Sequence, residues 1–89
     1  MSHWTFLTNH AQVLLCIARN QSATAREIAV EVGITERAVQ RILRDLHDAG
    51  YVSHTRVGRS NRYAIHGDTP MRHPAQQGLV VRELLDLLG

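Results

Sequence analysis

At 89 residues with 44% hydrophobic content, the chain has room for one small packed domain, and composition excludes disorder of the whole chain. No stretch approaches the roughly 18 apolar residues of a membrane span, and no signal-peptide pattern opens the chain. The single cysteine, Cys16, excludes an internal disulfide and a cysteine-rich zinc site, so a soluble, cytoplasmic protein is expected.

The net charge is only +2, but the basic residues are unevenly placed. All ten are arginine, and six of them fall between positions 37 and 62 beside two acids, whereas the rest of the chain has four arginines and six acids. Arginine has a planar fork of donors that suits phosphates and guanine edges. Codon bias in a GC-rich genome is an alternative explanation for the missing lysine. The clustering itself indicates a surface that binds a polyanion.

The first half of the chain predicts three helices. Apolar periodicity predicts one over 9–19, with Thr8 or Asn9 as its N-cap. Thr24 and Glu27 form a capping box that starts a short second helix, and Gly33 suits the left-handed position that ends it. The third helix is expected from Glu36 to about Ala49, after a cap at Thr35. Its apolar residues occupy one arc, and the opposite side carries Arg37, Gln40, Arg41, Arg44 and Asp48.

The second half begins with a change of period. Residues 51–57 and 62–66 are rich in β-branched and aromatic side chains and flank a loop at 58–61, which predicts a hairpin with a four-residue loop. An irregular connector is expected over 67–74 and a helix over 75–89. Apolar residues cover about half the circumference of that last helix, which indicates a dimer contact, or a cover for the first helix of its own chain.

This order predicts a mainly α fold with a β-hairpin wing: a winged helix-turn-helix of three helices and a two-stranded wing, with an extra C-terminal helix. The stretch from about Thr24 to His66 resembles the winged helix-turn-helix domain of small bacterial transcriptional regulators of the MarR and ArsR groups. The leading WTFLTNHAQVLL and the trailing RHP also resemble compact regulators of that kind. The resemblance implies a homodimer that binds a palindromic operator, with the helix 36–49 in the major groove and the 51–66 hairpin as wing.

The expected units are therefore a DNA-binding domain at 1–66, the connector at 67–74 and a dimerisation helix at 75–89, unless the chain is truncated after Gly89. The expected partners are double-stranded DNA and a second copy, without a membrane or cofactor. Arginine can bond guanine and glutamine adenine, Thr35 can bond phosphate at a helix N-terminus, and wing arginines can follow the DNA backbone. The expected DNA-binding residues are Thr35, Arg37, Gln40, Arg41, Arg44, Arg56, Arg59 and Arg62.

Other interpretations remain open at this stage. Charged helix faces are usually only solvated, and Arg41 or Arg44 can pair with Asp45 or Asp48. A winged helix can also serve as a protein-interaction module without DNA binding. An ArsR-like metal sensor would have His66, Asp68 and His73 as candidate ligands.

An enzyme is not expected. The six histidines form no recognised ligand pair, and Cys16 lacks a base partner in sequence. His10 is interpreted as a half-buried histidine that bonds locally in the first turn of its helix.

Overall fold

The computed structural model describes residues 4–89. The start of the expected DNA-binding domain, residues 1–3 with His3, lies outside the described residues. The elements follow in the order α1 (Asn9–Arg19), α2 (Ala25–Val32), α3 (Glu36–Asp48), β1 (Val52–Val57), β2 (Ser60–Ile65), the 3-10 turn η1 (Pro74–Gln76) and α4 (Val81–Leu88). The predicted winged helix-turn-helix with an extra C-terminal helix is confirmed.

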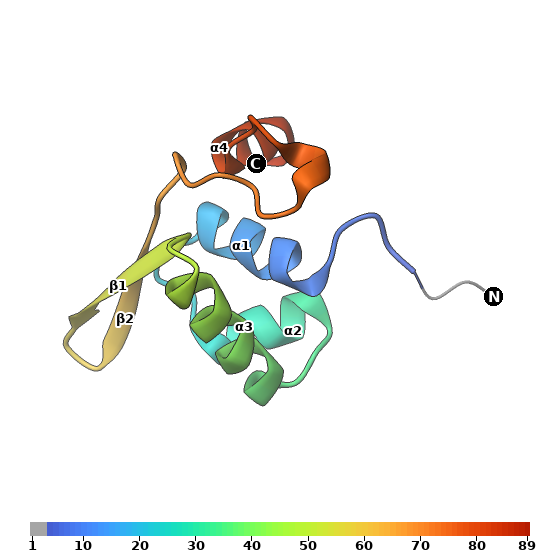
Figure 1. The fold of residues 1–89 in the computed structure, drawn as a ribbon. Helices are drawn as coiled ribbons and strands as arrows, with labels where there is room; N and C mark the ends of the chain where they lie inside the picture. The colour runs from blue at the N-terminus through green and yellow to red at the C-terminus, as the bar shows by residue number, and fades with distance from the viewer. Residues whose placement is uncertain (1–3) are drawn as a thin grey trace.

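Helix α1 lies at the centre of the fold. It contacts α2 and α3 on one side and α4 on the other, and β2 packs against it as well (Figure 1). Ile17, Ile28, Val13 and Val39 are fully buried where the first three helices meet. Removing such apolar side chains from water supplies the main stabilising free energy of a domain this small.

The local signals of the helix-turn-helix all form as expected. The Thr8 hydroxyl caps α1 by accepting from the Ala11 amide at 3.2 Å. Thr24 and Glu27 exchange two hydrogen bonds in the predicted capping box, at 2.9 and 3.1 Å. Gly33 ends α2 with φ 83°, a left-handed conformation that costs glycine little. Only Ile34 separates it from Thr35, the cap of α3, so the two helices are held in one short turn.

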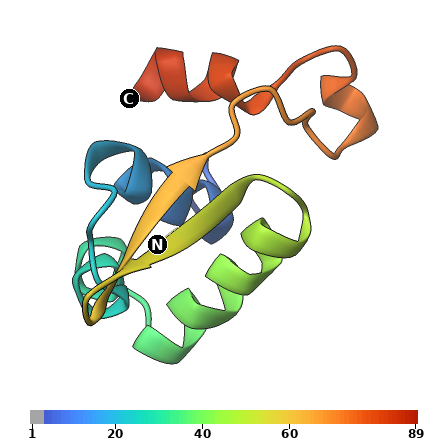
Figure 2. The ribbon, with the colours of Figure 1, turned by 90° about the vertical axis from the view of Figure 1, so that its left-hand side faces the viewer.

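The hairpin differs from its prediction at the loop. Strands β1 and β2 pair antiparallel from Val52 with Ile65 as far as Val57 with Ser60, so the loop holds two residues instead of four. Gly58 has φ 62° and Arg59 has no positive φ, which matches a type II′ turn with glycine first. Because this tight turn is available, Ser60 and Asn61 join the ladder. Figure 2 shows the hairpin running beside α3.

The last helix is shorter than expected and begins at Val81 instead of residue 75. Before it, the chain forms the turn η1, passes through Gly78 at φ 89°, and returns so that Val80 pairs with Pro70. The Val80 amide donates to the Glu83 carboxylate at 3.2 Å, and this fixes the start of α4. Extended pairing at Val80 therefore prevents the earlier helical start.

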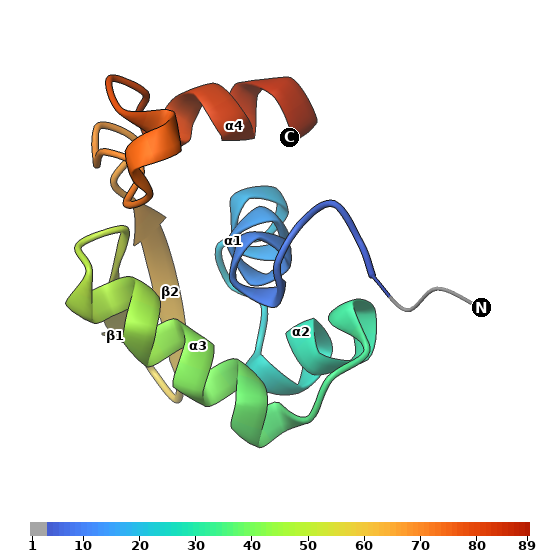
Figure 3. The same ribbon diagram turned by 45° about the vertical axis from the view of Figure 1, so that its right-hand side comes forward.

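Helix α4 lies over α1, with the connector beside it (Figure 3). Val81 is buried in the common core and Leu85 packs against it, whereas Leu87 is 80% exposed. The helix therefore covers the first helix of its own chain and still presents an apolar end. Among residues 4–89, none of the helices has the length and apolar character that crossing a membrane requires.

Candidate nucleic-acid interface

One side of α3 packs in the core, and the opposite side is exposed to solvent. Val39, Ile42 and Leu46 are buried, one helical turn or less apart. The same spacing turns the polar residues outward, and every expected contact residue on this helix is exposed: Thr35, Arg37, Gln40, Arg41 and Arg44. The Thr35 hydroxyl accepts from the Ala38 amide at 3.0 Å, which leaves its own hydrogen able to donate to a phosphate.

Two acids near the end of α3, Asp45 and Asp48, pair with histidines and not with the arginines of the helix. Asp45 lies 2.9 Å from His10 Nε2 on α1, and Asp48 lies 3.5 Å from His47 Nδ1. Within residues 4–89, the arginines at 37, 41, 44, 56, 59 and 62 form no ion pair, although Arg19 pairs with Glu31 and Arg82 with Asp68. The alternative in which Arg41 or Arg44 is neutralised by Asp45 or Asp48 is therefore wrong in this structure.

The wing places its three arginines differently. Arg59 lies at the tip of the two-residue turn. Across the ladder, Arg56 faces Asn61, on the side that also carries Val52 and Tyr63, and Arg62 faces Thr55 on the opposite side. The Arg56 Nε donates to the Gly58 carbonyl at 3.4 Å, close to the tip. Arg56 and Arg62 therefore cannot both lie against the same surface.

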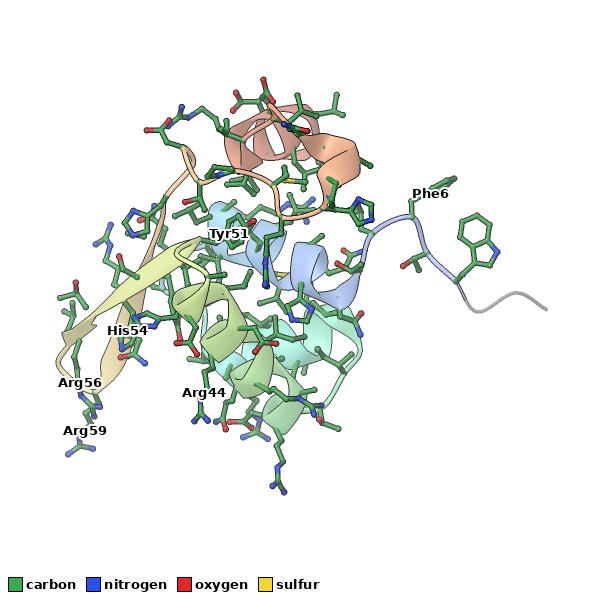
Figure 4. All side chains as sticks on the ribbon, viewed as in Figure 1. Phe6, Arg44, Tyr51, His54, Arg56 and Arg59 are labelled. Carbon is green, nitrogen blue, oxygen red and sulfur yellow. The ribbon has the colours of Figure 1, made fainter. Side chains whose placement is uncertain are left out.

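Arg44 of α3 projects toward the same side of the molecule as Arg56 and Arg59 at the end of the hairpin (Figure 4). Six exposed arginines thus come from two neighbouring elements, α3 and the wing. We call this surface, comprising the exposed side of α3 from Thr35 to Arg44 together with Arg56 and Arg59 of the wing, the basic face, and Arg62 lies on the opposite side of the hairpin. Positive charge without internal partners attracts a polyanion over several ångströms.

Two hollows border the basic face and contain residues that the sequence interpretation left out. One, of about 400 Å³, lies between α3 and the wing, with Arg44 and His47 on one side and His54 and Tyr63 on the other. The second, of about 230 Å³, joins Thr24 at the start of α2 to Arg59 and Asn61 of the wing. The two-residue alternation of the predicted strand already placed His54 on the side of Arg56. Asn61 was missed because it was assigned to the loop.

A larger cleft of about 420 Å³ lies on another side of α3, between α1, the connector and α4. Leu14, Leu46 and Val81 contribute apolar surface to it, and His10 and Arg72 lie among its lining residues. It contains none of the expected DNA-binding residues.

The candidate metal ligands have other partners. His66 Nε2 lies 3.0 Å from the Ser53 hydroxyl, His73 Nδ1 accepts from the Ala75 amide at 3.0 Å, and Asp68 pairs with Arg82 at 2.6 Å. In the described part of the chain, no three side chains of histidine, cysteine, aspartate or glutamate are grouped so that they could hold a metal ion. The structure therefore does not assemble the ligand set of the metal-sensor alternative.

Two further expectations concern single side chains. Cys16 is buried in the core, and burial, followed by the nearby Glu31 carboxylate, raises the pKa of its thiol. A raised pKa keeps the thiol protonated and poorly nucleophilic. His10 is exposed and bonds to Asp45 on α3, so the expectation of a local bond within its own helix is wrong.

Comparison with known proteins places these features in context. A model described as MarR family matches residues 5–62. Among solved structures, the zinc-responsive MarR family member ZitR of Lactococcus lactis is 19% identical, with a TM-score of 0.56 over 72% of this chain and 46% of that one. A MarR family protein of Mycobacterium tuberculosis, in complex with salicylic acid, is 24% identical, with a TM-score of 0.59 over 91% of this chain and 54% of that one.

The chain spans about half the length of each of these two structures. A search of curated proteins gives no match. At these identities the two structures support the fold, and the matches do not extend to the ArsR group that the sequence also resembled.

Proposed function

This chain belongs to the MarR family, whose members are winged-helix transcription regulators, and we propose that it binds double-stranded DNA sequence-specifically to regulate transcription. One observation carries the proposal: six exposed arginines without ion pairs among the described residues lie on α3 and the adjoining wing. In this proposal α3 enters the major groove, and the wing lies along the backbone or minor groove.

The contact residues divide by the chemistry that they offer. Arg37, Gln40, Arg41 and Arg44 present forked donors and an amide from an exposed helix face, which suits base edges. Thr35 suits a phosphate at the start of α3. Arg59, at the tip of the wing, contacts the DNA backbone. Arg56 and Arg62 lie on opposite sides of the hairpin, so one of them contacts the DNA backbone with Arg59 and the other contacts the far side of the DNA groove.

The protein-interaction alternative predicts a different surface. A module that binds proteins through α3 would present an apolar or mixed face there, whereas each predicted contact residue of α3 is polar or basic. Association with DNA should weaken as salt rises, with a slope of about −0.9 in log affinity against log salt for each phosphate neutralised. Absence of binding even at low salt would favour the interaction module.

A random-library selection with the purified protein first identifies a preferred duplex. Titration of that duplex and a scrambled one then distinguishes the arginines. Arg41→Ala should lower specific affinity by about 1–3 kcal/mol and relax one operator position, whereas Arg59→Ala should weaken both duplexes alike. Arg72→Ala is a matched control, because Arg72 is exposed on the connector outside the basic face. Unchanged affinity for both basic-face variants would refute the assignment.

We also propose that residues 1–66 form the DNA-binding unit, 67–74 the connector and 75–89 the dimerisation segment. The support is the apolar end of α4, where Leu87 is 80% and Leu88 39% exposed. A two-fold dimer matches a palindromic site. Sedimentation at micromolar concentration should give twice the 10.0 kDa mass of the chain, and Leu87→Glu should shift it toward monomer. A wild-type monomer under these conditions would contradict dimerisation.

A further inference from the structure

Two histidines face each other across the groove between α3 and the wing. His47 lies in the last turn of α3, and His54 lies on β1. Their ring centroids are 5.7 Å apart, and the His54 ring lies 6.1 Å from that of Tyr63, its partner across the ladder. Both histidines are exposed, and Figure 4 shows His54 between the hairpin and α3.

The groove between α3 and the wing lies at the edge of the basic face and shares residues with it. Gln40 and Arg44, two of the expected contact residues, line it from α3. Arg56 lies on the same side of the wing as His54, two residues further toward the tip. In the proposed complex, a DNA backbone that contacts both Arg44 and Arg56 would pass over the two imidazoles.

The charges that face the histidines are of both signs. From α3 they are Arg44 and Asp48, whose carboxylate is 3.5 Å from His47 Nδ1. From the wing they are Arg56 and the phenol of Tyr63. Among the described residues that line the groove, Asp48 is the one carboxylate. Charging both imidazoles in the free protein sets two cations against each other and against Arg44, and Asp48 offsets part of this repulsion at His47.

We propose that His47 and His54 bind a DNA backbone phosphate in their protonated form, so that DNA binding is coupled to proton uptake in this groove. The inference rests on the proposed DNA-binding function and adds two contact residues to it. A phosphate bound at the exposed edges of both rings would neutralise the charges that repel one another and would replace Asp48 as the partner of His47. Because histidine changes charge between about pH 5 and 8, DNA affinity rises as pH falls through that range.

The test compares wild type with the double variant His47→Gln/His54→Gln on one duplex at pH 5.5, 6.5 and 7.5. Glutamine keeps a polar side chain but does not titrate. Wild-type affinity should rise about tenfold from pH 7.5 to 5.5, and its salt slope should steepen by roughly 0.9 for each histidine that contacts phosphate. The double variant should lose most of both changes. Circular dichroism at each pH verifies that it stays folded.

His10→Gln is the matched control, because His10 is also an exposed histidine beside a carboxylate but lies at the other cleft. This control should keep the wild-type pH dependence. Retention of the full pH dependence by the double variant, or equal weakening at every pH, would overturn the inference. Failure of wild type to bind at pH 7.5 and low salt would instead refute the proposed function, since the arginines are charged there.

Discussion

The basic face and the connector side of the molecule use polar residues in opposite ways. On the connector side, the Tyr51 hydroxyl donates to the Pro70 carbonyl at 2.6 Å, the Thr69 hydroxyl donates to the Gly50 carbonyl at 2.9 Å, and Arg82 pairs with Asp68 at 2.6 Å. On the basic face, Arg37, Arg41 and Arg44 have no ion pair within residues 4–89. The same residue type, arginine, thus holds the chain together in one region and stays available in the other.

The presence or absence of acid partners helps to distinguish a charged surface that is only solvated from one that binds an anion. An arginine that already has an acid partner has less to gain from an external anion, because that partner must be displaced. Two acids of the same helix are instead paired with histidines, Asp45 with His10 and Asp48 with His47. The pattern of partners, more than the count of arginines, therefore supports a polyanion as the ligand of the basic face.

The largest expected effect is a loss of stability that affects both regions, because the basic face and the connector side are built on one common core. Ile28 of α2 is fully buried among the helices. Ile28→Ala should lower the free energy of unfolding by about 2–5 kcal/mol through lost burial and a residual cavity. Urea unfolding followed by circular dichroism measures it. Val30→Ala is the matched control, since Val30 lies on the same helix but is 80% exposed; its change should stay within about 0.5 kcal/mol. Similar losses for both would contradict this description of the core.

The next largest effect is a loss of stability on removing one hydrogen bond of the connector side, which tests whether that side is separate from the basic face in function. Tyr51→Phe removes the donor to the Pro70 carbonyl and keeps the ring in the core. The free energy of unfolding should fall by about 0.5–1.5 kcal/mol, the net value of such a bond. DNA affinity measured on the folded variant should equal that of wild type, because Tyr51 lies outside the basic face. A large loss of DNA affinity at unchanged stability would show that the two regions are not separate in function.

The helix-turn-helix was predictable from sequence because its signals are local. The Thr24 and Glu27 capping box, the glycine at 33 and the cap at Thr35 each act within a few residues, so the pattern alone indicates where α2 and α3 begin and end. The exposed side of α3 followed from its apolar periodicity. The residues expected to contact DNA are accordingly all exposed, although their contacts with DNA stay predictions.

What the sequence could not predict depends on contacts between distant segments. The start of α4 is set by the pairing of Val80 with Pro70, and the bond of His10 reaches across to Asp45 on another helix. The hairpin loop was expected to be longer because Ser60 and Asn61 are common turn residues, whereas the tight turn at Gly58 places them in the ladder. The facing of His47 and His54 likewise requires α3 and β1 to be packed together.

The smallest expected effect concerns Glu27, an exposed acid whose carboxylate caps the start of α2. The backbone hydrogen bond from Thr24, with its side-chain bond second, lowers the pKa of Glu27 below its usual 4.5. A lowered pKa in the folded state means that ionised Glu27 stabilises the protein above its ordinary pKa. This contribution is lost as pH falls through the lower folded value.

Glu27→Gln keeps an acceptor for the Thr24 amide but removes the titrating charge. The variant should therefore be less stable than wild type at pH 7, and the difference should shrink as pH falls from about 4.5 toward the lower pKa of the folded state, where the wild-type carboxylate in the folded protein becomes protonated. Thermal unfolding of both proteins from pH 7 to pH 3 measures the gap. A gap that stays constant over this range would mean that the Glu27 charge contributes nothing to the cap. In that case the charge of Glu27 would have no stabilising role within the chain, and this helix end would not differ in that respect from the arginines of the basic face, which form no ion pair within residues 4–89.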